Sequence, residues 1–196
     1  MQFQQAENFV WNLLETSLPN YLTYHGIIHT EKVLEASIEI ATEEKITNTE
    51  DLTLLKTAAL FHDCGFTQVY DEHEAKGCEI AQEVLPGYQY SVEQINIICN
   101  LIMKTKLPQQ PVTLLEKILC DADLYYLGSH HFYEVSERLY QEWIAIKKVS
   151  SKKEWNEAEV EFLEGHQYWT DSAKKTRGKI KGQHLIRLKQ KLHQEF

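Results

Sequence analysis

The sequence has no long apolar run and no excess of positive charge. No hydrophobic segment approaches the roughly 20 residues of a membrane-spanning helix, and the first nine residues, MQFQQAENF, lack the positive n-region and apolar h-region of a secretory signal. Lysine and arginine number 20 against 29 aspartate and glutamate residues, which gives a net charge of −9. We therefore expect a cytoplasmic protein that binds neither a membrane nor polymeric nucleic acid, whose phosphates are held mainly by Lys and Arg. A small phosphorylated ligand remains compatible, because a metal ion can neutralise phosphate locally.

Glycine, proline and closely paired cysteines are also scarce. With 8 Gly and 4 Pro in 196 residues, the chain has no flexible linker, and we expect a single domain. The four cysteines form no C-x-x-C, so we interpret them as reduced thiols packed in the interior. Hydrophobic residues make up 43% of the chain, which is enough for a full core.

Apolar residues recur at helical spacing almost throughout the chain. One stripe runs from Phe3 to Leu14 and ends before Pro19, and the next continues from His29 to Ile40. No segment alternates with period two between hairpin turns. The pattern predicts an all-α fold, a bundle of about eight or nine helices.

Three later helix starts carry capping-box signatures, in which a hydroxyl accepts from a backbone N–H and the residue three positions on reaches back. The pairs are Ser91 with Gln94, Thr113 with Glu116, and Ser151 with Glu154. The composition changes near residue 130, because the informative histidines and acids precede it. We expect residues 1–130 to form the core and residues 131–196 to add C-terminal helices packed on it, in a single domain overall.

His62 and Asp63 stand side by side at the end of an apolar segment, LKTAALFHDCGF. Buried charge is costly there unless it is paired or binds a metal, and both residue types ligate metals when deprotonated. Helix neighbours diverge by about 100°, so the two side chains can reach one ion from different directions, or the carboxylate can bridge to a second ion. His29 lies 33 positions before His62, and Asp121 and Asp123 follow in LEKILCDADLYYLG. Spread over separate predicted helices, these residues indicate a divalent-metal site.

This pattern resembles that of the HD-domain superfamily of metal-dependent phosphohydrolases. The resemblance extends over about residues 24–127, and 62–65 read H-D-x-G. It implies an all-helical fold that holds a divalent metal. The implied metal ligands are His29, His62, Asp63 and Asp123.

The downstream acid of this pattern has two candidates. In the A-D-x-L form of the family, the ligand is the aspartate that follows the small residue, which is Asp123 in this chain. Asp121 lies two positions earlier, about 200° around a helix, so we do not expect both carboxylates at one ion. We favour Asp123 as the ligand and assign Asp121 to capping a neighbouring group or to a position behind the ligands.

The segment YHGIIHT, residues 24–30, resembles the Y-H-N-x-x-H-A motif of cyclic-nucleotide phosphodiesterases, a branch of the same superfamily. That resemblance implies that His29 binds metal and that His25 donates a proton to the leaving oxygen. Gly26 and Thr30 depart from the motif. A histidine near its ordinary pKa of about 6.5 suits proton transfer, and a metal-bound histidine cannot donate the same proton. The alternative is that His25 only caps the helix that carries His29.

Five further residues are candidates for a second metal or for substrate phosphate. The resemblance implies such a role for His73, which otherwise begins a solvated helix. Lys104 and Lys106, in LIMKTKLP, either meet phosphate or lie on the surface. Arg177 and Lys181 recur at helical spacing and either line the mouth of a pocket or form a basic solvated face.

The resemblance implies an enzyme, a nucleotidase or phosphodiesterase that cleaves a phosphoester of a nucleotide or another small phosphorylated molecule. A metal-activated water would be the nucleophile, with His25 and Asp63 as catalytic residues. Mixed imidazole and carboxylate ligands favour Mn²⁺, Fe²⁺, Co²⁺ or Ni²⁺, with Mg²⁺ at a water-rich second position. Two alternatives stand. One is a sensor module that binds metal or nucleotide without turnover. The other is an HD-type diiron oxygenase, which would need additional histidine ligands, and Thr105 stands where one is often found. The sequence gives no oligomeric state.

Overall fold

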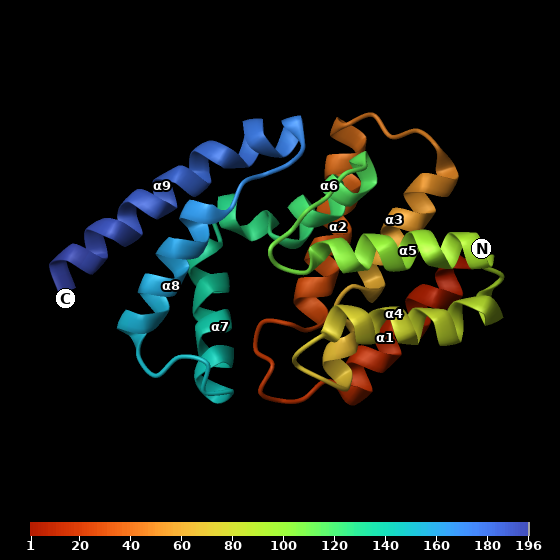
Figure 1. Cartoon of the computed structure of the whole chain (residues 1–196), viewed down its shortest axis with the longest axis horizontal. Coiled ribbons are helices and arrows are strands. Elements are labelled where there is room, and N and C mark those ends of the chain that lie inside the picture. The colour runs from red at the N-terminus through yellow and green to blue at the C-terminus, as the bar shows by residue number, and fades with distance from the viewer. Residues whose placement is uncertain (196) are drawn as a thin grey trace.

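The computed structural model describes residues 1–195, which form nine α-helices and no strand (Figure 1). The helices are α1 (Phe3–Ser17), α2 (Ile27–Glu43), α3 (Thr49–Phe61), α4 (His73–Val84), α5 (Val92–Thr105), α6 (Leu114–Asp123), α7 (Phe132–Ala145), α8 (Lys152–Gly165) and α9 (Asp171–Glu195). Three 3₁₀ turns follow α3, α4 and α6, namely η1 (Cys64–Thr67), η2 (Leu85–Tyr88) and η3 (Tyr125–Gly128). The all-α prediction is confirmed. Among the described helices, none is long and apolar enough to cross a membrane.

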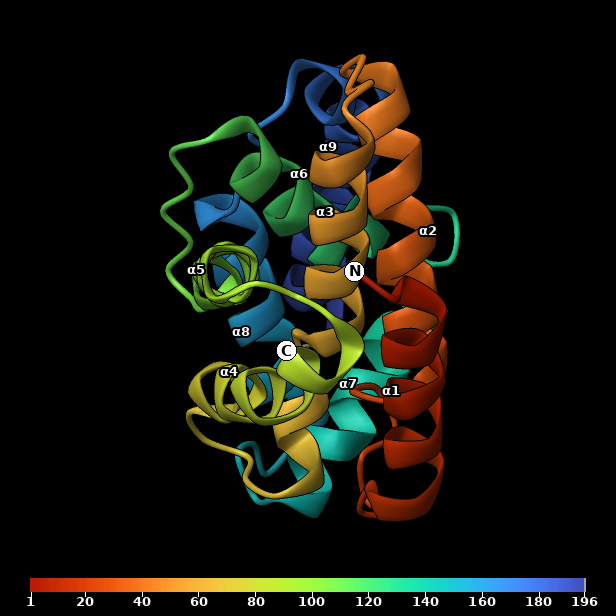
Figure 2. The same cartoon turned by 90° about the vertical axis from the view of Figure 1, so that its right-hand side faces the viewer.

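The helices gather in two groups, with α1 to α6 on one side and α7 to α9 on the other (Figures 1 and 2). The first group encloses a core that extends from Ala6 in α1 to Ala122 in α6. A smaller core joins η3 to α7, α8 and α9, and its buried members are Leu124, Leu127, Phe132, Leu163 and Leu188. The second group packs on the first through η3 and α9, although the division at residue 130 stays a prediction.

Two of the three predicted capping boxes form in full, at the starts of α5 and α6. The third forms only in part. Ser151 accepts from the backbone N–H of Glu154, but the Glu154 carboxylate accepts from the backbone N–H of Ser150 at 2.7 Å and from its hydroxyl at 2.8 Å. The Glu154 carboxylate therefore bonds to Ser150 and not to the backbone N–H of Ser151, because Ser150 offers two donors to it.

A buried carboxylate ties α6 to the start of α9. Both oxygens of Asp121, whose side chain is fully buried, accept hydrogen bonds of 2.7 Å from the backbone N–H of Trp169, the backbone N–H of Thr170 and the Thr170 hydroxyl. The Thr170 hydroxyl in turn accepts from Ala173 N–H in the first turn of α9. Asp121 thus points toward the C-terminal segment, as expected for the residue two positions from a ligand.

We predict that Asp121→Ala lowers the free energy of unfolding by about 3 kcal/mol, because it leaves buried donors of Trp169 and Thr170 without an acceptor. Urea denaturation measures the loss. Glu157→Ala, which removes an exposed carboxylate from α8, is the control and should change stability by less than about 0.5 kcal/mol. Equal midpoints for the two variants would contradict the role given to Asp121.

Candidate metal centre and adjoining pocket

Four side chains from α2, the end of α3 and the end of α6 meet at one point. Nε2 of His29 lies 3.3 Å from Oδ2 of Asp63 and 3.2 Å from Oδ1 of Asp123. Nε2 of His62 lies 3.2 Å and 3.5 Å from the same two oxygens. The two nitrogens are 3.2 Å apart. The structure therefore brings together all four residues predicted as metal ligands.

The local fold explains this convergence. His29 lies on the buried face of α2, which packs against α3 and α6. His62 is the C-cap of α3, and Asp63 follows in the turn that leads into η1, so the two neighbours leave the helix in different directions. Asp123 is the last residue of α6. Each ligand sits at an end or on a buried face, where packing holds its backbone.

The donor set fits a divalent cation. Nδ1 of His62 donates to the carbonyl of Ala59 at 2.8 Å, which leaves the Nε2 lone pair facing the cluster. Oδ2 of Asp63 is buried and has no hydrogen-bond partner among the described residues. Crowded, buried nitrogen and oxygen acceptors are costly unless a cation satisfies them, and imidazole with carboxylate suits divalent transition metals.

The four groups shift one another's protonation. Burial lowers the pKa of His62, but Asp63 and Asp123 outweigh burial and raise it well above its usual value. Burial raises the pKa of Asp123, but hydrogen bonds with the two histidines outweigh burial and bring it to about 2. The carboxylates are thus held ionised. A cation competes with protons for the imidazole nitrogens, so metal affinity should fall as the pH falls.

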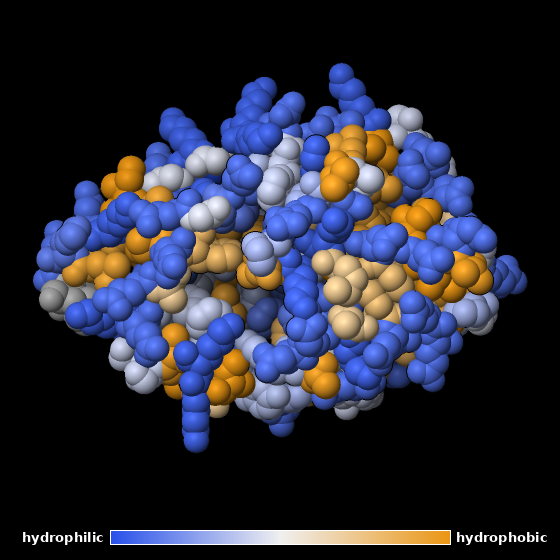
Figure 3. All heavy atoms as spheres, viewed as in Figure 1, coloured by the Kyte–Doolittle hydropathy of each residue, from blue (hydrophilic) through white to orange (hydrophobic). Residues whose placement is uncertain are grey.

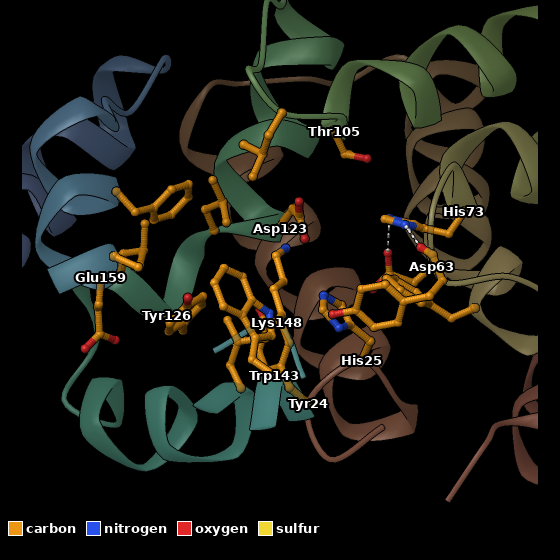
Figure 4. A pocket seen from close by; sticks show the side chains of 18 of the residues that line it. Tyr24, His25, Asp63, His73, Thr105, Asp123, Tyr126, Trp143, Lys148 and Glu159 are labelled. Carbon is orange, nitrogen blue, oxygen red and sulfur yellow. Dashed lines mark hydrogen bonds and ion pairs between the residues drawn. The ribbon is translucent and has the colours of Figure 1, made fainter. Parts of the chain in front are cut away.

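A pocket of about 490 Å³ opens beside this cluster. On the face shown in Figure 3, the surface is hollowed where the C-terminal helices face α4 and α5. Asp63, Asp123, His25 and His73 line one end of the pocket, and side chains from η3, α7 and α8 line the other (Figure 4). The cluster of four candidate ligands, called the metal-type cluster below, therefore borders a pocket of the size that small ligands occupy.

His25 is held apart from the cluster by a buried partner on α7. Its Nδ1 lies 2.5 Å from Oε1 of Glu142, which is fully buried. Oε2 of the same carboxylate accepts from the backbone N–H of Tyr24 and of His25 at 3.0 and 3.1 Å, and Tyr70 donates its hydroxyl to Oε1 at 3.1 Å. The His25 ring stacks on Phe66 at 4.3 Å. These contacts fix the ring and leave Nε2 for the pocket.

The bond to Glu142 differs from the capping alternative for His25. The N-cap of α2 is Gly26, and among the residues that the structure describes no side chain caps that end of the helix. Burial raises the pKa of Glu142, but its hydrogen bond with His25 outweighs burial and lowers it. Glu142 therefore stays ionised and accepts the Nδ1–H of His25 as a carboxylate.

His73 faces the second oxygen of Asp63. Its Nδ1 lies 3.1 Å from the carbonyl of Tyr70, whereas its Nε2 lies 3.7 Å from Oδ1 of Asp63 and 3.4 Å from Oε1 of Glu74. This approach requires Gly65, because a β-carbon there would lie 1.9 Å from the His73 carbonyl oxygen. The glycine of H-D-x-G thus lets α4 pack against η1, which places His73, the first residue of α4, at the pocket.

The two lysines of LIMKTKLP do not line the pocket. Lys104 donates to the carbonyl of Gln110 at 2.9 Å, and Lys106 pairs with Glu72 at 2.5 Å. Both bonds are exposed, so these lysines correspond to the surface interpretation. Thr105 between them does line the pocket.

The predicted C-terminal cations also lie elsewhere. Arg177 stacks over the ring of Tyr125 at 3.4 Å and pairs with Glu39. Lys181 donates to the carbonyl of Leu163 at 3.1 Å, where α8 ends. Neither residue lines the pocket, and both are partly buried rather than on an open basic face, because they secure α9 against α2, η3 and α8.

Sequence reasoning missed Glu142, which is buried behind His25, and Lys148, which lines the pocket. Glu142 lies seven positions after Val135 and three after Leu139, so an acid on an apolar helical stripe was the available signal. Lys148 follows α7 and carries its Nζ 3.8 Å from the centre of the Trp143 ring. Among the described residues that line the pocket, it is the only lysine or arginine. No motif marks it.

We predict that His29→Ala loses metal whereas His25→Ala retains it, because only His29 shares the four-ligand cluster. Elemental analysis of protein purified with Mn²⁺ measures occupancy, and the rise in melting temperature on adding Mn²⁺ gives an independent readout. Equal metal content in the two variants would refute the division of roles.

The HD domain family model matches residues 26–127, which is 102 of the 196 residues. A crystal structure described as a predicted HD superfamily hydrolase, from an uncultured Thermotogales bacterium, aligns with a TM-score of 0.63 and 23% sequence identity. The alignment covers 95% of this chain and 91% of the other, and at this identity it shows a shared fold. A comparison with curated proteins found no match. The predicted resemblance is thereby confirmed for the superfamily, although the link of Y-H-x-x-x-H to cyclic-nucleotide phosphodiesterases is not. This chain belongs to the HD domain family.

Proposed function

We propose that this protein is a metal-dependent phosphohydrolase that cleaves a phosphoester of a nucleotide or another small phosphorylated molecule. The observation that carries the proposal is that His25 and two members of the ligand cluster, Asp63 and Asp123, line the same pocket. Phosphoester cleavage needs a site that neutralises phosphoryl charge and a proton donor for the leaving oxygen. Both components border one space of about 490 Å³.

Four residues would hold the metal, namely His29, His62, Asp63 and Asp123. The bound ion would supply an activated water and would neutralise charge on the phosphoryl oxygens. Their mixed nitrogen and oxygen donors support Mn²⁺, Fe²⁺, Co²⁺ or Ni²⁺. Oδ1 of Asp63, together with His73 and Glu74, supports a second position for Mg²⁺. Lys148 adds a positive charge for the phosphate, at a pocket where the residue after H-D-x-G is the uncharged Phe66.

His25 would donate its Nε2 proton to the leaving oxygen. The Glu142 carboxylate holds Nδ1–H, so it selects the ring orientation and stabilises the protonated imidazole before transfer. The Phe66 ring blocks rotation on one side. Tyr70 adds a hydrogen bond to the same carboxylate. This arrangement separates metal binding from proton transfer within one turn of chain.

We predict that His62→Ala and Asp63→Ala abolish metal binding and phosphoester hydrolysis together. The assay is a screen of nucleoside mono-, di- and triphosphates and cyclic nucleotides with Mn²⁺-loaded protein, before and after treatment with a chelator. Full hydrolysis in metal-free buffer would exclude this mechanism. Bound metal without turnover on any of these compounds would favour the sensor module instead.

We predict that Glu142→Gln keeps its metal but lowers kcat by about 100-fold, because a neutral amide orients the Nδ1–H of His25 less firmly than the carboxylate does. Metal content and melting temperature, measured alongside kcat, distinguish this effect from general damage. Tyr70→Phe, which removes one hydrogen bond but keeps the Glu142 carboxylate, is the control and should lower kcat much less. An unchanged kcat in Glu142→Gln would refute the pairing.

A further inference from the structure

The pocket has two chemically different ends. The metal-type end carries Asp63, Asp123, His25 and His73. The opposite end is formed by η3, α7 and α8, and it is mostly aromatic and aliphatic, with Tyr126, Trp143, Trp155 and Phe162 among its lining residues. Figure 4 shows Tyr126 and Trp143 on the side of the pocket away from Asp63 and His73. The second end has no part in the chemistry described above.

This apolar end is built before any ligand arrives. The rings of Trp143 and Trp155 meet edge to face at 5.1 Å and 87°. Trp155 is 3% exposed, and its indole N–H points to the Ser136 hydroxyl at 3.4 Å. Because these contacts fix both indoles, the wall offers a preformed aromatic surface that costs little ordering on binding.

The charges near this end disfavour a second anionic group. Its ionisable lining residues from α8 are Glu159 and Glu161. Glu159 is buried, and burial raises its pKa to about 7. Figure 4 shows its carboxylate directed away from the middle of the pocket. Lys148 lies over the Trp143 ring, in the middle of the pocket in Figure 4, so its charge is placed for the one phosphate between the two ends. An uncharged, ring-shaped group therefore matches the wall better than a polyol or a second phosphate.

We propose that the apolar wall of η3, α7 and α8 binds the organic part of the substrate, and that this part is a planar ring of nucleobase size carried on a phosphomonoester. This inference rests on the proposed phosphohydrolase function and names its substrate class. The phosphate would lie at the metal-type end, with the ring against Phe162 and Trp143. Since α7 and α8 lie outside the matched residues 26–127, the two tryptophans and Phe162 of this wall belong to the part of the chain that the family model leaves out, whereas Tyr126 lies at its edge.

The sharpest test compares substrates that differ only in the ring. Adenosine, guanosine, cytidine and uridine 5′-monophosphates share the leaving oxygen of ribose 5-phosphate, so leaving-group chemistry is constant. For at least one of the four nucleotides, kcat/KM should exceed that of ribose 5-phosphate by about tenfold or more, as expected when an apolar pocket selects a matching group. Equal kcat/KM values for all five compounds would overturn the inference while leaving the phosphohydrolase function intact.

A matched pair of variants locates the effect. Phe162→Leu removes a pocket ring, and Phe9→Leu makes the same change at a partly buried phenylalanine of α1. Phe162→Leu should lower kcat/KM for the preferred nucleotide about threefold or more without changing that for ribose 5-phosphate, whereas Phe9→Leu should change neither. An equal loss on both substrates would overturn the assignment of the wall.

Binding of the unphosphorylated nucleosides separates this inference from the proposed reaction. Calorimetric titration of the metal-loaded protein with the four nucleosides should detect binding of at least one, and Phe162→Leu should weaken it where Phe9→Leu does not. Nucleoside binding without hydrolysis of any phosphoester would support the proposed binding site for the ring and would contradict the proposed phosphohydrolase function. No nucleoside binding would overturn the ring site, whatever the hydrolysis.

Discussion

The crowding of two imidazole nitrogens against two carboxylate oxygens governs the arrangement of the first six helices. Each histidine Nε2 lies within 3.5 Å of an oxygen of Asp63 and of Asp123, in a buried setting. Such a cluster is stable only where a cation or protons compensate it. The helices α2, α3 and α6 must therefore pack closely enough to bring the ligands together, and the start of α4 must approach η1 across Gly65. The apolar core provides that packing. Burial of apolar side chains throughout α1 to α6 therefore offsets the unfavourable free energy of bringing the four ligands together.

Local chemistry made much of the site predictable from the sequence. His62 and Asp63 are conspicuous because two ionisable residues follow an apolar segment. The family resemblance implies Asp123 as the ligand, and helical geometry keeps Asp121 away from the same ion. The structure places Asp123 in the cluster and Asp121 against Trp169 and Thr170. The helices were predictable for a similar reason, since their apolar stripes and caps lie within a few residues of one another.

Long-range pairing could not be predicted in the same way. Glu142 lies 117 residues from its partner His25, and its segment has the ordinary pattern of an amphipathic helix. The spacing of charged residues also did not predict where their side chains lie. Arg177 and Lys181 have the spacing of a basic face, but they contact Tyr125 and the end of α8. Which cation faces a pocket depends on how helices pack, and Lys148 shows that a residue without any motif can take that position.

The origin of Glu142 in α7 has a consequence for dynamics. The four ligands belong to α2, α3 and α6, whereas the partner of His25 and the apolar pocket wall belong to helices that pack around the smaller core. Local opening of α7 and α8 would withdraw the histidine's partner and the wall together and leave the four ligands in place. A protein built in this way can remain folded and loaded with metal while fluctuating out of its competent state, so its turnover would follow the equilibrium of that opening as well as the chemistry.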